Sequence, residues 1–123
     1  MTAINNADVK SLRHVDSRCA HYDNVNVHGS MMDKAVVFEG NYDLRSAFFR
    51  MKAGQVIARH THTKWVQVMI LSGSMKIEQE GVEDIVAKAG SVYFLDPHYP
   101  HTETALEETL VLVTQGEDRP GWQ

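Results

Sequence analysis

The sequence predicts an all-β protein, built as a barrel or a sandwich, with jelly rolls among the options. Short apolar runs rich in Val, Ile, Phe, Tyr and Met follow one another, and each ends near a Gly or a Pro. No window keeps the 3.6-residue period of an amphipathic helix. Short strands at regular spacing are typical of all-β barrels and sandwiches. The predicted strands are Ala35–Glu39, Arg45–Lys52, Gln55–His62, Trp65–Leu71, Ser74–Glu80, Val82–Ala87, Ser91–Leu95 and Leu110–Thr114.

The ends of these strands carry turn signals. Gly73 and Gly81 each follow a polar residue between two predicted strands and predict tight hairpin turns, because Gly adopts positive φ without steric cost. The segment Asp96–Pro100 contains two prolines, which fix φ twice and remove two N–H donors. Such a stiff loop suits the presentation of the residue that follows it, His101.

Length and composition limit the organisation and the partners. A chain of 123 residues is one domain by default, and we expect an N-terminal arm over 1–30 that is irregular or forms a short strand, a barrel over 31–116 and a flexible tail over 117–123. The formal net charge of −4 disfavours nucleic acid and anionic membranes, which require clustered Lys and Arg. The chain has seven His but a single Cys, Cys19, so a metal would be bound without paired thiolates. No apolar signal segment is visible at the N-terminus, which predicts a cytoplasmic protein.

His60 and His62 are two residues apart in a predicted strand, so their side chains lie on one face. If that face points into the barrel, two unpartnered imidazoles enter an apolar interior, which is costly. A divalent metal would satisfy both, because neutral imidazole is the commonest side-chain metal ligand. The alternative is an exposed pair in a polar turn, beside Arg59 and Lys64. Gln67 on the next predicted strand is a further candidate, because an amide among apolar side chains needs either a hydrogen-bond partner or a metal.

Two stretches of the chain resemble the two sequence motifs of the cupin superfamily. The first match runs from Gly54 to Gly73: five residues separate Gly54 from the triplet His60, Thr61 and His62, four more lead to Gln67, and five more to Gly73. The second match begins at Gly90, and after five residues it continues with Asp96, Pro97, His98, Tyr99, Pro100 and His101. The resemblance implies a single-domain cupin β-barrel, a double-stranded β-helix or RmlC-like jelly roll. It also implies a divalent transition metal held by His60, His62, Gln67 and His101. Such ligands accept Fe, Mn, Ni, Cu or Zn, so the sequence does not select the metal.

The chain departs from the family pattern at several positions. Gln67 stands at or one place beyond the usual Glu, and His98 stands where the family has a Gly. A neutral amide in place of Glu leaves the metal its full double charge, which predicts a stronger Lewis acid and a preference for anionic, oxygen-bearing ligands. Gln67 could instead lie outside the donor set, or be a polar core residue bonded to a strand backbone.

Glu103 and Tyr93 are the candidates for proton transfer. Glu103 follows His101 by two residues, so the two share a face, and a carboxylate beside an apolar cavity can have a raised pKa. Tyr93 could face the interior from the preceding predicted strand, and either group could be a general acid or base. The alternative for Glu103 is a surface position. The remaining histidines are assigned to the cavity rim (His98) or to the surface (His14, His21 and His28).

These residues support functions of different classes. The first is a metal-dependent enzyme that acts on a small oxygenated or anionic metabolite. Small cupins that the chain resembles include Fe(II) dioxygenases that cleave β-diketones and a sugar-acid cupin that ketonises unsaturated uronates. The spacing of His60, His62, Gln67 and His101 matches that of the sugar-acid cupin, and this resemblance favours isomerase or lyase chemistry. The second is a non-catalytic module that binds a small ligand or a metal, and the third a barrel with a vestigial His cluster. A homodimer is expected from the family and from apolar residues on both faces of Trp65–Leu71.

Overall fold

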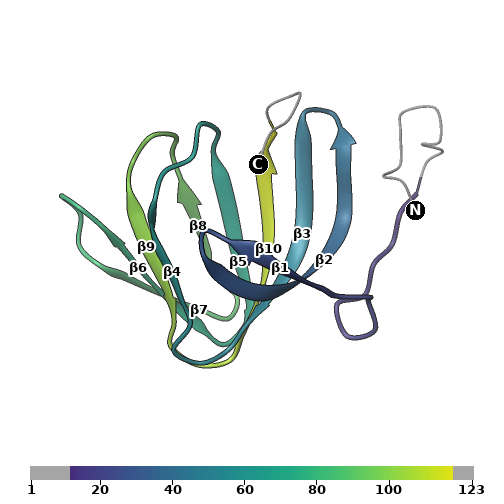
Figure 1. Cartoon of the computed structure of the whole chain (residues 1–123), viewed down its shortest axis with the longest axis horizontal. Coiled ribbons are helices and arrows are strands. Elements are labelled where there is room, and N and C mark those ends of the chain that lie inside the picture. Colours follow the sequence, from purple (N-terminus) through teal and green to yellow (C-terminus); the bar gives the residue numbers. More distant parts are fainter. Residues whose placement is uncertain (1–11, 118–123) are drawn as a thin grey trace.

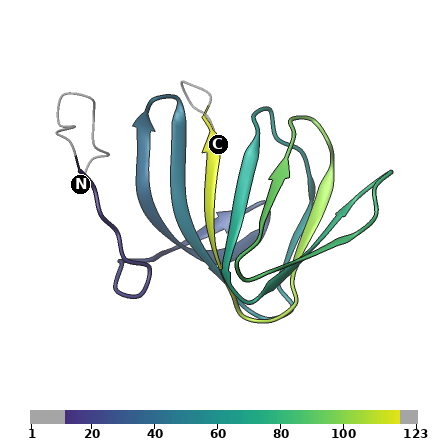
Figure 2. The same cartoon turned by 180° about the vertical axis from the view of Figure 1, so that it is seen from behind.

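The computed structural model describes residues 12–117, whose regular structure consists of β-strands arranged in two antiparallel sheets (Figures 1 and 2). The larger sheet has the order β1-β2-β3-β10-β5-β8 and the smaller one the order β4-β9-β6-β7. The strands are β1 (Asp23–Val27), β2 (Ser30–Asn41), β3 (Leu44–Met51), β4 (Val56–His60), β5 (Val66–Ser72), β6 (Ser74–Gln79), β7 (Ile85–Lys88), β8 (Val92–Leu95), β9 (His101–Ala105) and β10 (Thr109–Gly116). None of the described residues belongs to a helix that could span a bilayer. The predicted all-β jelly roll is confirmed.

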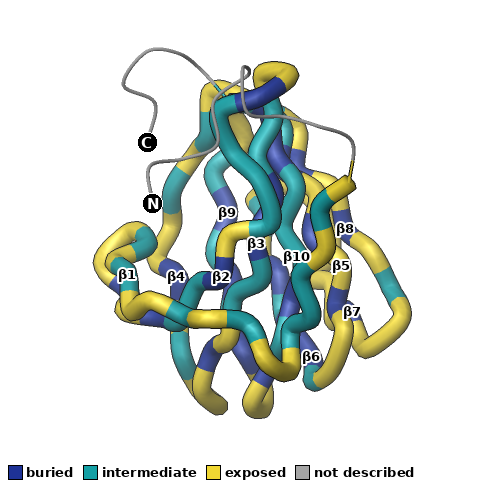
Figure 3. The backbone as a smooth tube through the Cα atoms, turned by 90° about the vertical axis from the view of Figure 1, so that its right-hand side faces the viewer, coloured by how far each residue is buried: buried dark blue, intermediate teal, exposed yellow. Residues whose placement is uncertain are grey.

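Buried and exposed positions alternate along β5, which shows which face of the larger sheet meets the core (Figure 3). Val66, Val68 and Ile70 are buried in the hydrophobic core. Gln67 and Met69 lie on the opposite, exposed face. The expectation that Gln67 faces the barrel interior is therefore wrong. The physical reason is that burial of the Gln67 amide without a hydrogen-bond partner would cost free energy, whereas Val66, Val68 and Ile70 are apolar throughout.

The polar strand β9 was not among the strands predicted from apolar runs. Its sequence alternates between buried positions, His101, Glu103 and Ala105, and half-buried Thr102 and Thr104. β9 pairs with β4 on one side and with β6 on the other, so it lies in the middle of the smaller sheet. Its inner face is polar where a core strand would be apolar, and this polar inner face builds the candidate site.

The β1–β2 hairpin extends the larger sheet towards the edge of the smaller one. β1 lies within the predicted N-terminal arm and pairs with β2 from Asp23↔Lys34 to Val27↔Ser30. The Gln55 amide, just before β4, donates hydrogen bonds to Ser30 Oγ, at 2.7 Å, and to the carbonyl of Met31. These bonds hold the hairpin beside β4. Residues 118–123 of the predicted tail lie outside the described part of the chain.

Side chains of β3 point alternately to the cavity and to the outer surface. Arg45 and Phe49 line the interior cavity. Arg50 lies on the outer face, where its guanidinium stacks 3.6 Å from the ring centroid of Tyr22 and forms an ion pair with Asp33 at 3.2 Å. The strand therefore carries one arginine on each face, and of the two only Arg45 lines the cavity.

Candidate metal centre

Three of the histidines singled out by their spacing lie together at one end of the smaller sheet. His60 ends β4, His62 lies in the loop that follows, and His101 begins β9 directly opposite His60. The ring centroids are 4.7 Å apart for His60 and His62, 4.4 Å for His60 and His101, and 4.9 Å for His62 and His101. The spacing in the sequence thus brings the three imidazoles into mutual contact.

Backbone carbonyls fix which nitrogen of two rings faces the site. Nδ1 of His60 lies 2.6 Å from the carbonyl oxygen of Ala58, and Nδ1 of His101 lies 3.0 Å from that of Tyr99. Since a carbonyl oxygen can only accept, both Nδ1 atoms carry the hydrogen, and each Nε2 presents a lone pair. A hydrogen bond of this kind also orients histidines that ligate metals.

Two buried nitrogens of the cluster have no hydrogen-bond partner in the described part of the protein. They are His62 Nδ1 and His101 Nε2. A buried polar atom without a partner costs free energy, so an electrophile that binds these lone pairs would be stabilised. The unpaired atoms therefore fit a divalent transition metal, for which the described residues offer two overlapping ligand groups that share His60.

Protonation of the histidines does not compete with metal binding at neutral pH. Burial lowers the pKa of His62 to about 3, with further contributions from His60 and His101, and burial likewise lowers the pKa of His60. Both imidazoles are therefore neutral near pH 7, which is the protonation state that binds metals.

Glu103 and Tyr93 meet inside the cavity, as expected for candidates that face the interior. Glu103 Oε1 lies 3.7 Å from Nε2 of His101 and 3.9 Å from Nε2 of His60. The hydroxyl of Tyr93 donates a hydrogen bond to Glu103 Oε2, and both side chains are buried. Burial, together with the charge of Glu103, raises the pKa of Tyr93 well above its usual 10, so the phenol remains a donor. His60, His101 and Glu103 form one group that could hold a metal ion.

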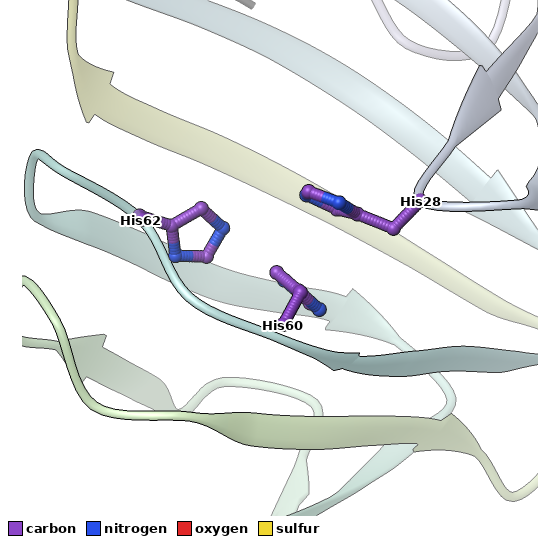
Figure 4. Close-up of side chains that lie close together, drawn as sticks. All are labelled: His28, His60 and His62. Carbon is purple, nitrogen blue, oxygen red and sulfur yellow. The ribbon is translucent and has the colours of Figure 1, made fainter.

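His28 is the site residue that the sequence analysis missed. It lies in the β1–β2 turn with φ +48°, and its side chain points towards His60 and His62 (Figure 4). The His28 and His60 rings stack with centroids 3.8 Å apart, and the centroids of His28 and His62 are 5.9 Å apart. These three residues form a second group that could hold a metal. His28 is exposed, as expected from the sequence, but it lies beside the other two histidines. The His28-Gly29 pair could have predicted a turn from the sequence. The contact of His28 with His60 of β4 is non-local, and no local sequence pattern predicts it.

Gln67 and His98 are placed differently from the other candidates. Gln67 lies on the exposed face of β5 and is not among the residues that line the cavity. His98 is exposed and adopts φ +74°, and its backbone N–H donates a hydrogen bond to the backbone carbonyl of His62 at 2.8 Å. The family has a Gly at this position because Gly adopts a positive φ without steric cost. His98 thus positions the backbone of His62.

The histidine cluster opens on an interior cavity of about 400 Å³. Apolar side chains of both sheets form much of its wall, and the polar residues that line it are Asn26, His28, Lys34, Arg45, His60, His62, Tyr93, Glu103 and Gln115. A concave, largely apolar site with a few convergent polar groups is typical of small-molecule binding.

Comparison with known proteins supports the same family. The sequence model of the ChrR cupin-like domain family matches residues 24–118. Among solved structures, an RmlC-like cupin from Shewanella frigidimarina is 16% identical with a TM-score of 0.72, and the match covers 89% of this chain and 94% of that one. KdgF from a Halomonas species is 21% identical with a TM-score of 0.70, covering 85% and 94% of the two chains.

A third similar structure is that of a predicted oxalate decarboxylase from Thermotoga maritima, which is 19% identical with a TM-score of 0.73 over 85% of this chain and 99% of that one. No curated protein matches the sequence. At these identities the solved structures establish the fold, while the family model covers most of the chain. The chain therefore belongs to the cupin superfamily, in the family of ChrR cupin-like domains.

Proposed function

We propose that the protein is a metal-dependent enzyme that acts on a small, oxygen-rich anionic metabolite. The observation that carries this proposal is the pair of buried, unpaired nitrogens, His62 Nδ1 and His101 Nε2, in a cluster that opens on a cavity of about 400 Å³. His60, His62 and His101 would hold Fe, Mn, Ni, Cu or Zn. Such a metal, when bound, supplies a Lewis acid that polarises substrate oxygens.

The residues around the histidines favour proton transfer. Glu103 presents Oε1 next to His60 and His101, while Oε2 accepts the hydrogen bond of Tyr93. We assign Glu103 the role of moving a proton to and from the substrate, and Tyr93 the role of positioning that carboxylate. Isomerases and lyases need such a proton carrier, so we favour this chemistry over a dioxygenase reaction.

The placement of Gln67 outside the cavity changes the expected charge of the site. With Gln67 exposed and Glu103 buried beside the histidines, a metal would have a carboxylate close to it rather than only neutral groups. Glu103 offsets part of the metal charge, so selectivity for an anionic substrate must come from other cationic groups in the cavity.

Metal analysis of purified variants is the decisive test. We expect about one transition metal per chain in the wild type and in His98→Ala, and none in His60→Ala or His101→Ala. Absence of stoichiometric metal in the wild type, after reconstitution with each of the five metals, would overturn the proposal. Turnover of unsaturated uronates and β-dicarbonyl compounds, followed with an oxygen electrode in parallel, separates the two reaction classes, because only a dioxygenase consumes oxygen.

A non-catalytic binding module is the second candidate, and His28 favours it. A fourth imidazole next to His60 and His62 could occupy the coordination position that a substrate needs. A site with all positions filled by protein is structural, whereas a catalytic site keeps one open. Exchange of water at a paramagnetic metal, measured by proton relaxation, would reveal whether a position is open.

We further propose that the protein forms a homodimer through the outer face of the larger sheet. Met69, Val92 and Phe94 are exposed on β5 and β8, and Phe94 stacks on Trp65 with ring centroids 5.7 Å apart. A second copy would cover this apolar face. Light scattering should give the dimer mass for the wild type and the monomer mass for Phe94→Glu.

A further inference from the structure

The part of the cavity farthest from the histidines is apolar, and methionines form much of it. Met32 of β2, Met51 of β3, Met75 of β6 and Val111 of β10 all line the cavity. All four side chains are buried and belong to the hydrophobic core. We call these four residues the apolar floor. Strands of both sheets contribute to it, so the floor closes the cavity from two sides.

The strand register places the floor beyond the polar groups of the smaller sheet. His101 begins β9, Glu103 lies two residues further along, and the next residue on the same face is Ala105, which pairs with Met75. Each such step along a strand covers roughly 7 Å. The histidine end and Met75 are therefore separated by the level at which Glu103 lies.

The larger sheet shows the same order from polar to apolar. Arg45 lies near the start of β3, where its charge adds to the effect of burial on the pKa of His62, whereas Met51 ends the strand. Lys34 and Arg45 also line a small adjoining pocket, and Glu39 lines it with them. The charged part of the wall thus has a carboxylate beside it, and a ligand that reaches the floor meets apolar side chains.

The cavity offers more room than a metal and the substrate oxygens on it need. Its volume is about 400 Å³, whereas an apolar cavity of about 150 Å³ is enough for a benzene molecule. Apolar walls give water few hydrogen bonds, so a hydrocarbon group fills such a space more favourably than water does. Methionine side chains are unbranched and adapt their shape, so the floor can fit hydrocarbon groups of different outline.

We propose that the apolar floor binds a hydrocarbon group of the substrate, while the oxygen-bearing end of the same molecule faces His60, His62 and His101. This inference deepens the proposed function and rests on it for the histidine end only. The substrate class is accordingly a small anion that carries its oxygens at one end and an alkyl or aryl group at the other.

The test compares three probes with the same 2-oxo acid head. Pyruvate has the head and a methyl group, 2-oxohexanoate adds three carbon atoms, and 2-oxoadipate replaces the terminal methyl of 2-oxohexanoate by a carboxylate. Isothermal titration of the Zn²⁺-loaded protein should show that 2-oxohexanoate binds about tenfold or more tightly than pyruvate, because each buried methylene contributes roughly fourfold. 2-Oxoadipate should also bind about tenfold or more weakly than 2-oxohexanoate, because its second carboxylate would lose water without gaining a partner on the floor.

Met32 and Met31 give a matched pair of variants on one strand. Met32 lines the cavity and is 3% exposed, whereas its neighbour Met31 is 52% exposed. Glutamine has nearly the shape of methionine but carries an amide. Met32→Gln and Met75→Gln should lower the preference for 2-oxohexanoate over pyruvate by about threefold or more, because the amide makes the floor polar. Pyruvate binding should stay the same, and Met31→Gln should keep the full preference.

Metal content and thermal unfolding, measured on the same samples, show which variants are loaded and folded. If both floor variants fail to fold, the three probes on the wild type decide alone. No binding of 2-oxohexanoate to the loaded wild type, or a ratio to pyruvate or to 2-oxoadipate close to one, overturns the inference. Folded Met32→Gln and Met75→Gln with the same preference as Met31→Gln overturn it as well.

A different result identifies failure of the proposed function. If the wild type binds no Zn²⁺ or other transition metal, the proposed function fails, and the floor is then tested on the metal-free protein with benzene. Benzene that binds to the wild type and to Met31→Gln, and more weakly to Met32→Gln, would still support the apolar floor. No binding of benzene would overturn it.

Discussion

The imidazoles of His28 and His60 stack with ring centroids 3.8 Å apart and planes inclined by 19°. His28 reaches this position from the β1–β2 turn, whereas His60 ends β4 in the other sheet. Burial lowers the pKa of both rings, so neither carries charge near neutral pH, and their close stack costs no electrostatic repulsion there. The stack therefore closes the histidine cluster on the side of the hairpin.

Replacement of His28 tests whether this ring is a ligand or a wall of the site. We expect His28→Phe to keep one metal per chain and to lower its affinity by at most about tenfold, because His60, His62 and His101 remain. Competition titration with a chromophoric chelator measures the affinity. His21→Phe, which changes an exposed histidine, is the control. Loss of stoichiometric metal in His28→Phe would make His28 an essential ligand and would favour the closed binding module.

Glu103→Gln separates proton transfer from metal binding. The variant keeps the shape of the side chain but removes the base, so turnover should fall by about 10²- to 10⁴-fold, while metal affinity changes by about tenfold or less. Tyr93→Phe leaves the buried carboxylate without its donor and should lower the free energy of unfolding by about 1–3 kcal/mol. In a Glu103→Ala background the same Tyr93→Phe change should cost less, as a double-mutant cycle in urea would show. Metal loss in Glu103→Gln equal to that in His60→Ala would assign Glu103 to the ligands instead.

The parts of the site that the sequence predicted are those encoded locally. His60 and His62 share a face because side chains alternate along a strand, and the two prolines before His101 fix the loop that delivers it. The face of β5 was predicted wrongly, because its apolar residues occur on both faces and periodicity alone does not say which one is buried. The exclusively β-branched face, Val66, Val68 and Ile70, was the better choice.

Other features depend on contacts that no local pattern carries. β9 has the sequence HTETA, whose inner positions hold His101 and Glu103, so it lacks the apolar alternation that marks a core strand. His28 meets His60 only because the β1–β2 hairpin folds against β4. Polar residues at inner positions break the hydrophobic pattern at the site itself, which is why prediction from pattern fails there.

His62 makes the stability of the metal-free protein dependent on pH. Its pKa is lowered from the usual 6.5 to about 3, so between these values the unfolded chain binds a proton that the folded chain does not. The free energy of unfolding should therefore fall as pH falls from about 6.5 towards 3. Above that range His62 is neutral in both the folded and the unfolded chain and does not make the free energy of unfolding depend on pH. Urea unfolding in EDTA from about pH 7 to about pH 4 measures this slope. His62→Gln should show a shallower slope than the wild type and than His21→Gln, and equal slopes in all three would contradict the prediction.

Gly73 and Gly81 both adopt φ +87°, but their surroundings differ, and this difference predicts different effects of a methyl group. A Cβ at Gly73 would lie 2.4 Å from the carbonyl oxygen of Glu108 and 2.4 Å from Thr109 Oγ1, whereas a Cβ at Gly81 would meet nothing within 4 Å. Gly81→Ala should therefore cost only the left-handed backbone conformation, about 1–2 kcal/mol. Gly73→Ala should cost that amount and a steric term of roughly 1–3 kcal/mol more, because the backbone of β10 must move and the hydrogen bonds of Thr109 with Ser74 weaken. Urea unfolding of the two variants measures the difference, and equal losses would show that the β5–β6 turn relaxes without strain.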